Sequence, residues 1–292
     1  MPTGPLNLDY GVIDIHIHVA PWGMLHEPIL EQLKQGRDRF EFLLSVSRDP
    51  QKLIALMDEA GIERVGVMNY VAPDIMGFTF AVNRFSADYA RDHRDRIFAH
   101  GSVDPVGSTD PNGELSLLLD EWGISAIKIH PPHQGVAPNA YLSGNTILPV
   151  IYEGCQRRGV PVVFHTGTTT FKGARIKYGD PIHIDDVACD FPDLTIIMAH
   201  AGRPLWYQTA RFLVRRHPNV YMDLSSIPPQ SIPRAFPDLA KYADKVLWGT
   251  DWPGPGVPDM KTNLHAFLQL GYDPAMTRQI LRDNAMRLFG WK

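Results

Sequence analysis

Residues 13–19 read IDIHIHV and place two histidines, His16 and His18, inside an apolar run. Side chains alternate between the faces of a β-strand, so His16 and His18 would share one face with Asp14. The isoleucines of the stretch would lie on the opposite face. A buried polar group without a partner costs ~1–3 kcal/mol, so the polar face needs hydrogen bonds, water or a metal ion. Taken alone, the stretch fits two hydrogen-bonded core histidines as well as it fits a metal site.

Similar apolar, β-branched runs recur along the chain and predict eight strands. They lie at 11–18, 62–70, 96–103, 124–130, 160–166, 194–200, 219–225 and 245–251. Helical spacing of apolar residues predicts helices at 49–60, 79–92, 111–121, 146–158, 181–190, 204–216, 231–243, 259–270 and 274–289. This alternation predicts an α/β fold, a parallel (β/α)8 TIM-type barrel that forms one domain over residues 1–292. A doubly wound open sheet is the alternative, but no glycine-rich phosphate loop follows any predicted strand.

The composition is that of an ordinary globular protein, with 44% hydrophobic and 21% charged residues and a net charge of −4. Because Lys and Arg form no basic stripe, a small molecule is a more natural partner than nucleic acid. No apolar run reaches the roughly 18 residues of a membrane helix, and the first residues do not resemble a signal peptide. Cys155 and Cys189 fall in predicted helices without CxxC spacing, which favours a reducing cytoplasm. The sequence leaves a homo-oligomer open.

Chemically reactive side chains gather where the predicted strands end. The set comprises His18, Lys128, His130, His165, His200 and Asp251, from the first, fourth, fifth, sixth and eighth strands. In a barrel of this kind the active site lies at the C-terminal ends of the strands, so these side chains would meet. Imidazole and carboxylate groups without a thiolate suit Zn²⁺, Mn²⁺, Fe²⁺ or Co²⁺. The shared position therefore favours a metal site over core histidines.

This ordered set resembles that of the amidohydrolase superfamily, with HxH on the first strand, Lys on the fourth, His on the fifth and sixth, and Asp on the eighth. The phrases IDIHIHV, IKIHPP, VVFHTGT, IIMAHAGRP, VLWGTDWP and NAMRLFG are similar to the amidohydrolase-2 (amidohydrolase-related) group. That group includes aminocarboxymuconate-semialdehyde decarboxylase and aromatic acid decarboxylases. The resemblance spans about residues 11–290, and the ordered set is far more specific than HxH alone.

The resemblance implies that His16, His18, His165 and Asp251 hold one divalent metal, with zinc expected first and Mn, Fe or Co as alternatives. His200 would lie beside the metal-bound water or the substrate, as a general acid/base or as a ligand of a second metal. A bound metal lowers the pKa of its water to roughly 7. Asp251 would then move the water's proton, while His200 would stabilise negative charge or protonate a leaving group.

Lys128 has two interpretations. In binuclear members of the superfamily a lysine on the fourth strand carries CO₂ as a carbamate that bridges two metals, whereas many members of the decarboxylase branch lack it. Alternatively, Lys128 only holds a substrate carboxylate or pairs with Asp251. Its presence leans toward hydrolysis, and the sequence leaves the carbamate open.

Three further residues are expected as substrate contacts near the mouth of the site. His130 would lie one step further out than Lys128. Arg203 would bind a substrate carboxylate in a bidentate contact, with a surface ion pair as the alternative. Trp252 would wall the pocket, with packing under the loops as the alternative. Asp14 is expected to orient an imidazole, and the loops 20–48, 131–145 and 167–180 are expected to set specificity.

Two reactions fit this site. One is hydrolysis of a small organic acid, amide or lactone by a metal-activated water. The other is non-oxidative decarboxylation of an aromatic or unsaturated carboxylic acid on the same metal site. A barrel that binds metal or ligand without catalysis is a hypothesis of another class, and it predicts a missing ligand, whereas none is missing. The sequence therefore predicts a metal-dependent hydrolase first and a carboxy-lyase second.

Overall fold

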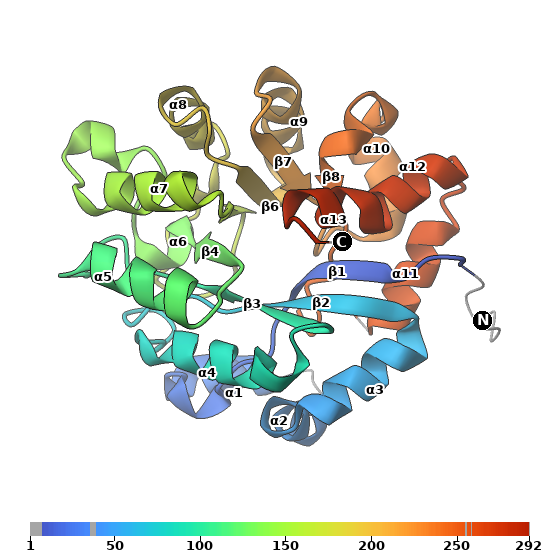
Figure 1. The fold of residues 1–292 in the computed structure, drawn as a ribbon, viewed down its shortest axis with the longest axis horizontal. Coiled ribbons are helices and arrows are strands. Elements are labelled where there is room, and N and C mark those ends of the chain that lie inside the picture. The colour runs from blue at the N-terminus through green and yellow to red at the C-terminus, as the bar shows by residue number, and fades with distance from the viewer. Residues whose placement is uncertain (1–7, 36–38, 255, 258, 292) are drawn as a thin grey trace.

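The computed structural model describes residues 8–35, 39–254, 256–257 and 259–291. Eight parallel strands form one sheet in the order of the chain, as the sequence predicts (Figure 1). They are β1 (Val12–Ile17), β2 (Ile62–Met68), β3 (Ile97–Gly101), β4 (Ala126–Ile129), β5 (Val162–Gly167), β6 (Ile196–Arg203), β7 (Val220–Asp223) and β8 (Val246–Leu247). The (β/α)8 barrel is confirmed, and its eighth strand is shorter than expected.

The sheet closes where the first strand meets the last. Ile15 N–H donates to the carbonyl of Trp248 at 3.1 Å, and Asp251 N–H donates to the carbonyl of His16 at 2.8 Å. His18 N–H donates to the carbonyl of Trp252 at 2.6 Å. These bonds continue past the end of β8 and place Asp251 beside the two histidines of β1.

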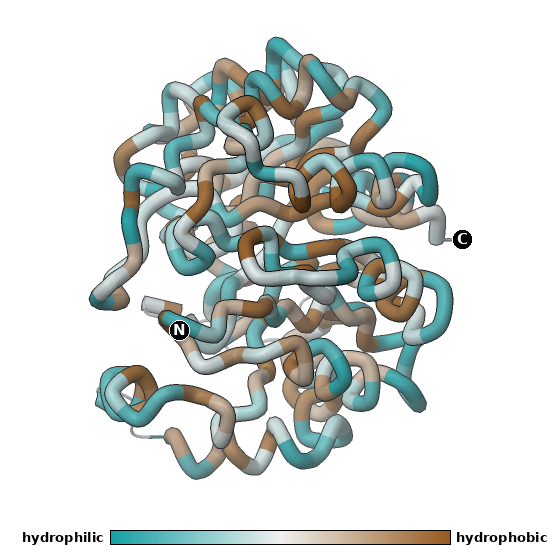
Figure 2. The backbone as a smooth tube through the Cα atoms, turned by 90° about the vertical axis from the view of Figure 1, so that its left-hand side faces the viewer, coloured by the Kyte–Doolittle hydropathy of each residue, from teal (hydrophilic) through white to brown (hydrophobic). Residues whose placement is uncertain are grey.

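Helices surround the barrel, and most of them match the predicted segments. The α-helices are α1 (Glu27–Lys34), α2 (Phe40–Arg48), α3 (Pro50–Ala60), α4 (Ala81–Ala90), α5 (Pro111–Ser116), α6 (Pro131–Gln134), α7 (Ile147–Arg158), α8 (His183–Asp190), α9 (Tyr207–Arg216), α10 (Ile232–Ala235), α11 (Met260–Leu268), α12 (Pro274–Arg278) and α13 (Asn284–Leu288). Figure 2 shows hydrophilic and hydrophobic segments alternating along the outer chain, as one-sided packing requires. No described helix is both long and apolar enough to cross a membrane.

Shorter helical turns complete the helices or link them to strands. They are η1 (Trp22–Met24), η2 (Arg91–His93), η3 (Leu117–Glu121), η4 (Ala140–Ser143), η5 (Ile176–Gly179), η6 (Pro229–Ser231), η7 (Leu239–Lys245) and η8 (Gln279–Asp283). The π-helical turn η3 ends the segment 111–121, and η8 interrupts the segment 274–289; the apolar spacing predicts both segments as continuous helices. The segment expected as the loop 20–48 contains α1 and α2, so its interpretation as a loop is wrong. The apolar residues Ile29, Leu43 and Val46 are the buried positions of these two helices.

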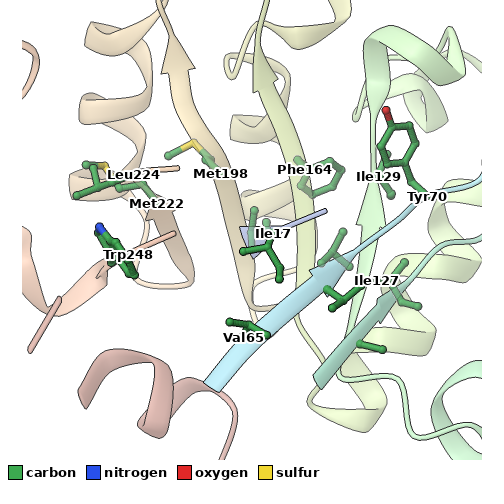
Figure 3. Close-up of a cluster of buried hydrophobic side chains, with 14 of the residues drawn as sticks. Ile17, Val65, Tyr70, Ile127, Ile129, Phe164, Met198, Met222, Leu224 and Trp248 are labelled. Atoms are coloured by element: carbon green, nitrogen blue, oxygen red, sulfur yellow. The ribbon is translucent and has the colours of Figure 1, made fainter. Parts of the chain in front are cut away.

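The strict alternation expected for β1 is also wrong, because the strand changes phase within the IDIHIH stretch. Three steps along β1, from Asp14 to Ile17, face only two steps along β2, from Val65 to Val67. Such an extra residue is a β-bulge, which turns the following side chains to the other face. Ile13 and Ile15 consequently belong to an inner cluster with residues such as Val163 and Leu247. Ile17 packs in the outer cluster between strands and helices, where Figure 3 shows it among other core side chains.

The inner cluster closes the end of the barrel opposite the predicted site. Phe98 from β3 meets the rings of Phe289 and Trp291 at centroid distances of 5.2 and 4.7 Å. These two residues follow α13, which Figure 1 shows lying over the centre of the barrel. The barrel interior is thus a packed apolar floor below and a polar chamber above.

Candidate active site

A cavity of about 200 Å³ opens at the C-terminal ends of the strands. Of the predicted residues, it is lined by His18, Lys128, His130, His165, His200, Arg203 and Asp251. Its apolar wall includes Trp22, Tyr70 and Phe78. A wider surface groove of about 1180 Å³ lies alongside and also contacts Arg203, but no histidine lines it. The cavity, rather than the groove, therefore holds the reactive groups.

His16 is held at one ring nitrogen by a carboxylate that the sequence analysis does not single out. Its Nδ1 lies 2.6 Å from Oδ2 of Asp223, at the end of β7, and both side chains are fully buried. Ser225 donates its N–H and its hydroxyl to the same carboxylate, at 2.7 and 2.6 Å. Burial and the positive charge of Lys128 hold the pKa of His16 well below its usual value, so the ring is neutral. Its one N–H then sits on Nδ1, and Nε2 carries a lone pair.

His18 is oriented in the same way by a backbone group. Its Nδ1 lies 2.6 Å from the carbonyl of Met68, at the end of β2. That carbonyl can only accept, so Nδ1 is the donor and Nε2 is left to face the site. His18 Nε2 faces Oδ1 of Asp251 at 3.1 Å, and His16 Nε2 faces the same oxygen at 3.6 Å.

This arrangement tests whether the residues fit a metal. When Nε2 of His18 carries no hydrogen, two imidazole lone pairs and a carboxylate oxygen point at one another. Three acceptors in contact repel unless a proton or a metal cation lies among them. His16 Nε2 has no hydrogen-bond partner although it is fully buried. Burial works to raise the pKa of Asp251, but its hydrogen bond to His18 and the neighbouring imidazoles hold that pKa below its usual value. The donor set therefore fits a divalent cation.

His165 and His200 complete the ring of imidazoles. His165 Nε2 is buried without a partner. The ring of His200 lies 4.8 Å from that of His165 and 4.9 Å from that of His16, measured between centroids. His200 Nδ1 is engaged by the hydroxyl and the carbonyl of Ser225, at 2.9 and 3.1 Å, which leaves Nε2 for the site. Ligand atoms of His16, His200 and Asp251 come within 4.8 Å of one another, so the geometry also admits His200 as a ligand.

The backbone is strained at two of these positions. His200 and Asp251 adopt φ angles of 64° and 67°, in the left-handed region that residues other than glycine rarely occupy. Each such conformation costs ~1–3 kcal/mol and persists where the surrounding structure imposes it, commonly at functional sites. The strain thus coincides with two of the predicted site residues, one within β6 and one in the segment after β8.

Lys128 lines the cavity and is 1% exposed, and its Nζ has no hydrogen-bond partner among the described residues. Burial lowers the pKa of its amine, while the charges of Asp223 and Asp251 work in the opposite direction. An unpaired buried amine costs stability. Lys128 therefore lowers the stability of the fold, which favours a role for its amine in the site.

The three expected substrate contacts differ in their surroundings. His130 lines the cavity, and its ring stacks on that of His165 at 3.9 Å between centroids. Arg203 lies at the cavity edge, ends β6 rather than beginning a helix, and donates from Nη1 to the carbonyl of Ser226 at 2.8 Å. It forms no ion pair with any carboxylate of the described residues. Trp252 accepts the N–H of His18 at its carbonyl, but its side chain is buried in the outer cluster and is not among the cavity-lining residues.

Sequence reasoning missed the groups that hold the ligands in place. Asp14 was expected to orient an imidazole, but its carboxylate instead accepts from the N–H and hydroxyl of Thr250 and the N–H of His16. The orienting role falls to Asp223. A signal existed, because Asp223 and Ser225 alternate at the end of the seventh predicted strand. His133, in the predicted loop 131–145, was also missed and lines the cavity.

Comparisons with known proteins identify a matching family and solved structures of similar fold. A family model described as amidohydrolase (Amidohydro_2) matches residues 13–291. An uncharacterised TIM-barrel protein from Bordetella bronchiseptica is 24% identical, with a TM-score of 0.75 over 96% of this chain and 99% of that one. A dihydroxybenzoic acid decarboxylase from a Polaromonas species, with bound manganese and 2-nitroresorcinol, is 18% identical, with a TM-score of 0.68 over 96% and 97% of the two chains. A probable 2-pyrone-4,6-dicarboxylic acid hydrolase from Acinetobacter baumannii, with citric acid bound, is 17% identical, with a TM-score of 0.66 over 97% and 100%.

At these sequence identities the solved structures show only that the fold is shared. The family model matches nearly the whole chain and therefore shows the family. The chain belongs to the amidohydrolase family. It is therefore an enzyme, a hydrolase or a carboxy-lyase, and the family implies a divalent metal at its site.

Proposed function

We propose that His16, His18, His165 and Asp251 hold one divalent metal, with Zn²⁺ as the first expectation. The support is the pair of oriented imidazoles on β1, whose Nε2 atoms face the carboxylate of Asp251. Bound there, the metal would act as a Lewis acid and activate water at neutral pH. His200 is placed to stabilise charge or move a proton from its Nε2, or to serve as a further ligand.

We further propose that the enzyme is a hydrolase of a small organic acid, amide or lactone. The observation that supports this proposal is Lys128. Its amine is fully buried beside Asp223 and Asp251 without a hydrogen-bond partner among the described residues, which favours a catalytic role over a structural one. An amine whose pKa is lowered has a larger neutral fraction, and only the neutral form reacts with CO₂ to give a carbamate. That group would extend the ligand set toward a second cation, the arrangement that favours hydrolysis.

The remaining residues divide the work of binding and proton transfer. Arg203 has no carboxylate partner among the described residues, so its guanidinium is available for a carboxylate of the substrate. His130 would donate a hydrogen bond to a second oxygen. Asp251 would accept the proton of the attacking water, and His200 would stabilise the charge that develops on the substrate.

A decarboxylase is the second candidate, and a different observation favours it. The cavity is narrow, and aromatic side chains such as Trp22, Tyr70 and Phe171 form much of its wall. An apolar wall suits a flat ring and weakens the solvation of a carboxylate, which helps CO₂ to leave. In that reaction Arg203 would bind the substrate carboxylate that leaves as CO₂. His200 would protonate the ring carbon.

One assay separates the two reactions. The metal-loaded enzyme is incubated with a panel of aromatic and unsaturated carboxylic acids, their amides and their lactones, and released CO₂ is measured beside released acid or amine. Hydrolysis predicts acid or amine without CO₂. Asp251→Asn is the matched control, because it keeps the volume of the side chain and should lower either activity by roughly 10²–10⁴-fold.

Metal content decides the role of Lys128. We expect elemental analysis to find two metals per chain in the natural protein and one in Lys128→Ala, with partial recovery of activity by short-chain carboxylic acids. One metal per chain in both proteins would contradict the carbamate and move the proposal to the decarboxylase.

Location and assembly are proposed on simpler grounds. Cys155 and Cys189 are free thiols, one buried and one exposed, which suits a reducing cytoplasm. A homo-oligomer remains a prediction to be measured by light scattering.

A further inference from the structure

His133 ties together three segments around the cavity. It lies in α6, directly after β4, and is 4% exposed. Its Nδ1 is 2.8 Å from the hydroxyl of Tyr70, which follows β2. Its Nε2 is 2.7 Å from the hydroxyl of Thr169, in the loop after β5. Both ring nitrogens are therefore engaged, which fixes the plane of the imidazole.

The fixed ring of His133 forms one side of a stack. His130 lies parallel to it, with centroids 3.7 Å apart and planes 20° from each other. On its other face His130 meets His165 at 3.9 Å and 15°. The ring of Tyr70 also contacts His130, at 4.6 Å. His130 is thus held by rings that are themselves anchored.

The backbone of α6 also selects a tautomer of His130. The N–H of His133 points at Nδ1 of His130 at 3.4 Å, in the capping position of the helix. Because Nδ1 accepts this N–H, a neutral His130 carries its own hydrogen on Nε2. The nitrogen left for the cavity is then a hydrogen-bond donor.

We propose that His133 is a positioning residue, which holds His130 in the stack so that Nε2–H of His130 donates to an oxygen of the substrate. The proposal rests on the proposed function for the identity of the substrate, but the geometry of the stack does not. Misplacing a reacting or binding group by about 1 Å can cost roughly 10²-fold in rate, so a residue that never touches the substrate can control it.

A spectroscopic test needs no substrate. The protein is labelled with ¹⁵N-histidine and treated with Zn²⁺, and NMR of the ring nitrogens reports the tautomer of each histidine. Signals that disappear in His130→Asn are those of His130. We expect a single Nε2–H tautomer in the natural protein, and broadened signals of His130 in His133→Ala because the ring is no longer held in the stack. A hydrogen on Nδ1 of His130 in the natural protein would overturn the proposal, whatever reaction the enzyme catalyses.

A kinetic test uses the substrate that the panel identifies. We expect His133→Ala to lower kcat/KM by roughly ten- to a hundred-fold. Because His133 acts through His130, the double variant His130→Asn with His133→Ala should be no slower than His130→Asn alone. Additive losses would show that His133 acts independently and would contradict the proposal.

Thr169→Val supplies a variant that leaves the core untouched. Thr169 lies in the loop after β5, and the change removes one hydrogen bond of His133 while it keeps the stack. We expect a few-fold loss of kcat/KM and broadened signals of His130, with the melting temperature unchanged. Should His133→Ala fail to fold, unchanged signals of His130 in Thr169→Val would count against the proposal.

Discussion

Asp223 Oδ2 lies 2.6 Å from Nδ1 of His16, although 207 positions separate the two residues in the chain. The contact joins the seventh strand to the first across the barrel interior. It sets the tautomer of His16 and so aims the lone pair of Nε2 at Asp251. The proposed role of His16 as a metal ligand thus depends on a residue of β7 as well as on β1.

Removing this contact should weaken metal binding without removing a ligand. We expect Asp223→Ala to lower the affinity for Zn²⁺ by roughly 10–100-fold, because the ring of His16 loses the group that orients it. Competition with a chromogenic chelator measures the change. Asp223→Asn keeps an acceptor oxygen and is the control, with a smaller loss expected. Equal affinities in Asp223→Ala and the natural protein would show that Asp223 does not orient a ligand.

Gly249 leaves no room for a side chain beside this contact. A Cβ at this position would lie 2.8 Å from Cβ of His16 and 2.9 Å from Oδ1 of Asp223. We therefore expect Gly249→Ala to push the two residues apart, to lower metal affinity and to reduce the free energy of unfolding by ~1–3 kcal/mol. Gly23→Ala is the matched control, since a Cβ there meets nothing within 4 Å. Urea denaturation of both variants provides the comparison.

Lys128 should show opposite effects on stability and activity. We expect Lys128→Met, which replaces a buried unpaired amine by an apolar chain of similar length, to raise the free energy of unfolding of the metal-free protein by ~1–3 kcal/mol. The same variant should lose its catalytic activity. Chemical denaturation and the activity assay measure the two effects. A less stable variant would indicate that the amine is well paired in solution.

A surface pair far from the cavity predicts how stability depends on pH. Asp238 accepts hydrogen bonds from Arg211 and, at 3.1 Å, from the hydroxyl of Tyr242, and Arg211 chiefly lowers its pKa to about 2. The unfolded carboxyl has a pKa of about 3.9, so it binds more protons than the folded one between the two values. The stabilisation is complete above about pH 5 and is lost as the pH falls toward 2.

The variant Asp238→Asn isolates this contribution. We expect it to be less stable than the natural protein at pH 7 and to approach the natural protein's stability near pH 2–3, in thermal denaturation at low salt. Asp92→Asn, whose carboxyl lies in η2 and appears in no ion pair of the described residues, is the control. A difference between Asp238→Asn and the natural protein that does not change with pH would contradict the assignment.

The barrel was predictable because its signal is periodic. Each buried strand is a run of β-branched residues such as Val162 to Phe164, and each helix repeats its apolar residues at helical spacing. The positions of His18, His165 and His200 followed from the same periodicity, because strand ends meet at one edge. Neither argument needs knowledge of which side chains touch.

The parts that escaped prediction depend on contacts between distant segments. The bulge in β1 arises from pairing with β2, so strict alternation placed Ile13 and Ile15 on the wrong face. Asp14 is expected from the sequence to orient an imidazole, and only the closed barrel shows that Thr250 engages Asp14 and that Asp223 orients His16 instead. His133 stood in a proline-rich loop, and nothing in its neighbours along the chain indicates Tyr70 or Thr169 as partners.

The seam between the first and last strands has a consequence for how the protein is made. Asp14 and Thr250, which bond across this seam, stand 236 positions apart. A ribosome therefore releases both histidines of β1 long before Asp251 exists, and the nascent chain offers no complete donor set for a cation. If His16, His18, His165 and Asp251 hold the metal as proposed, loading follows the synthesis of Asp251, and protein made without added metal should become active when a divalent metal is supplied afterwards.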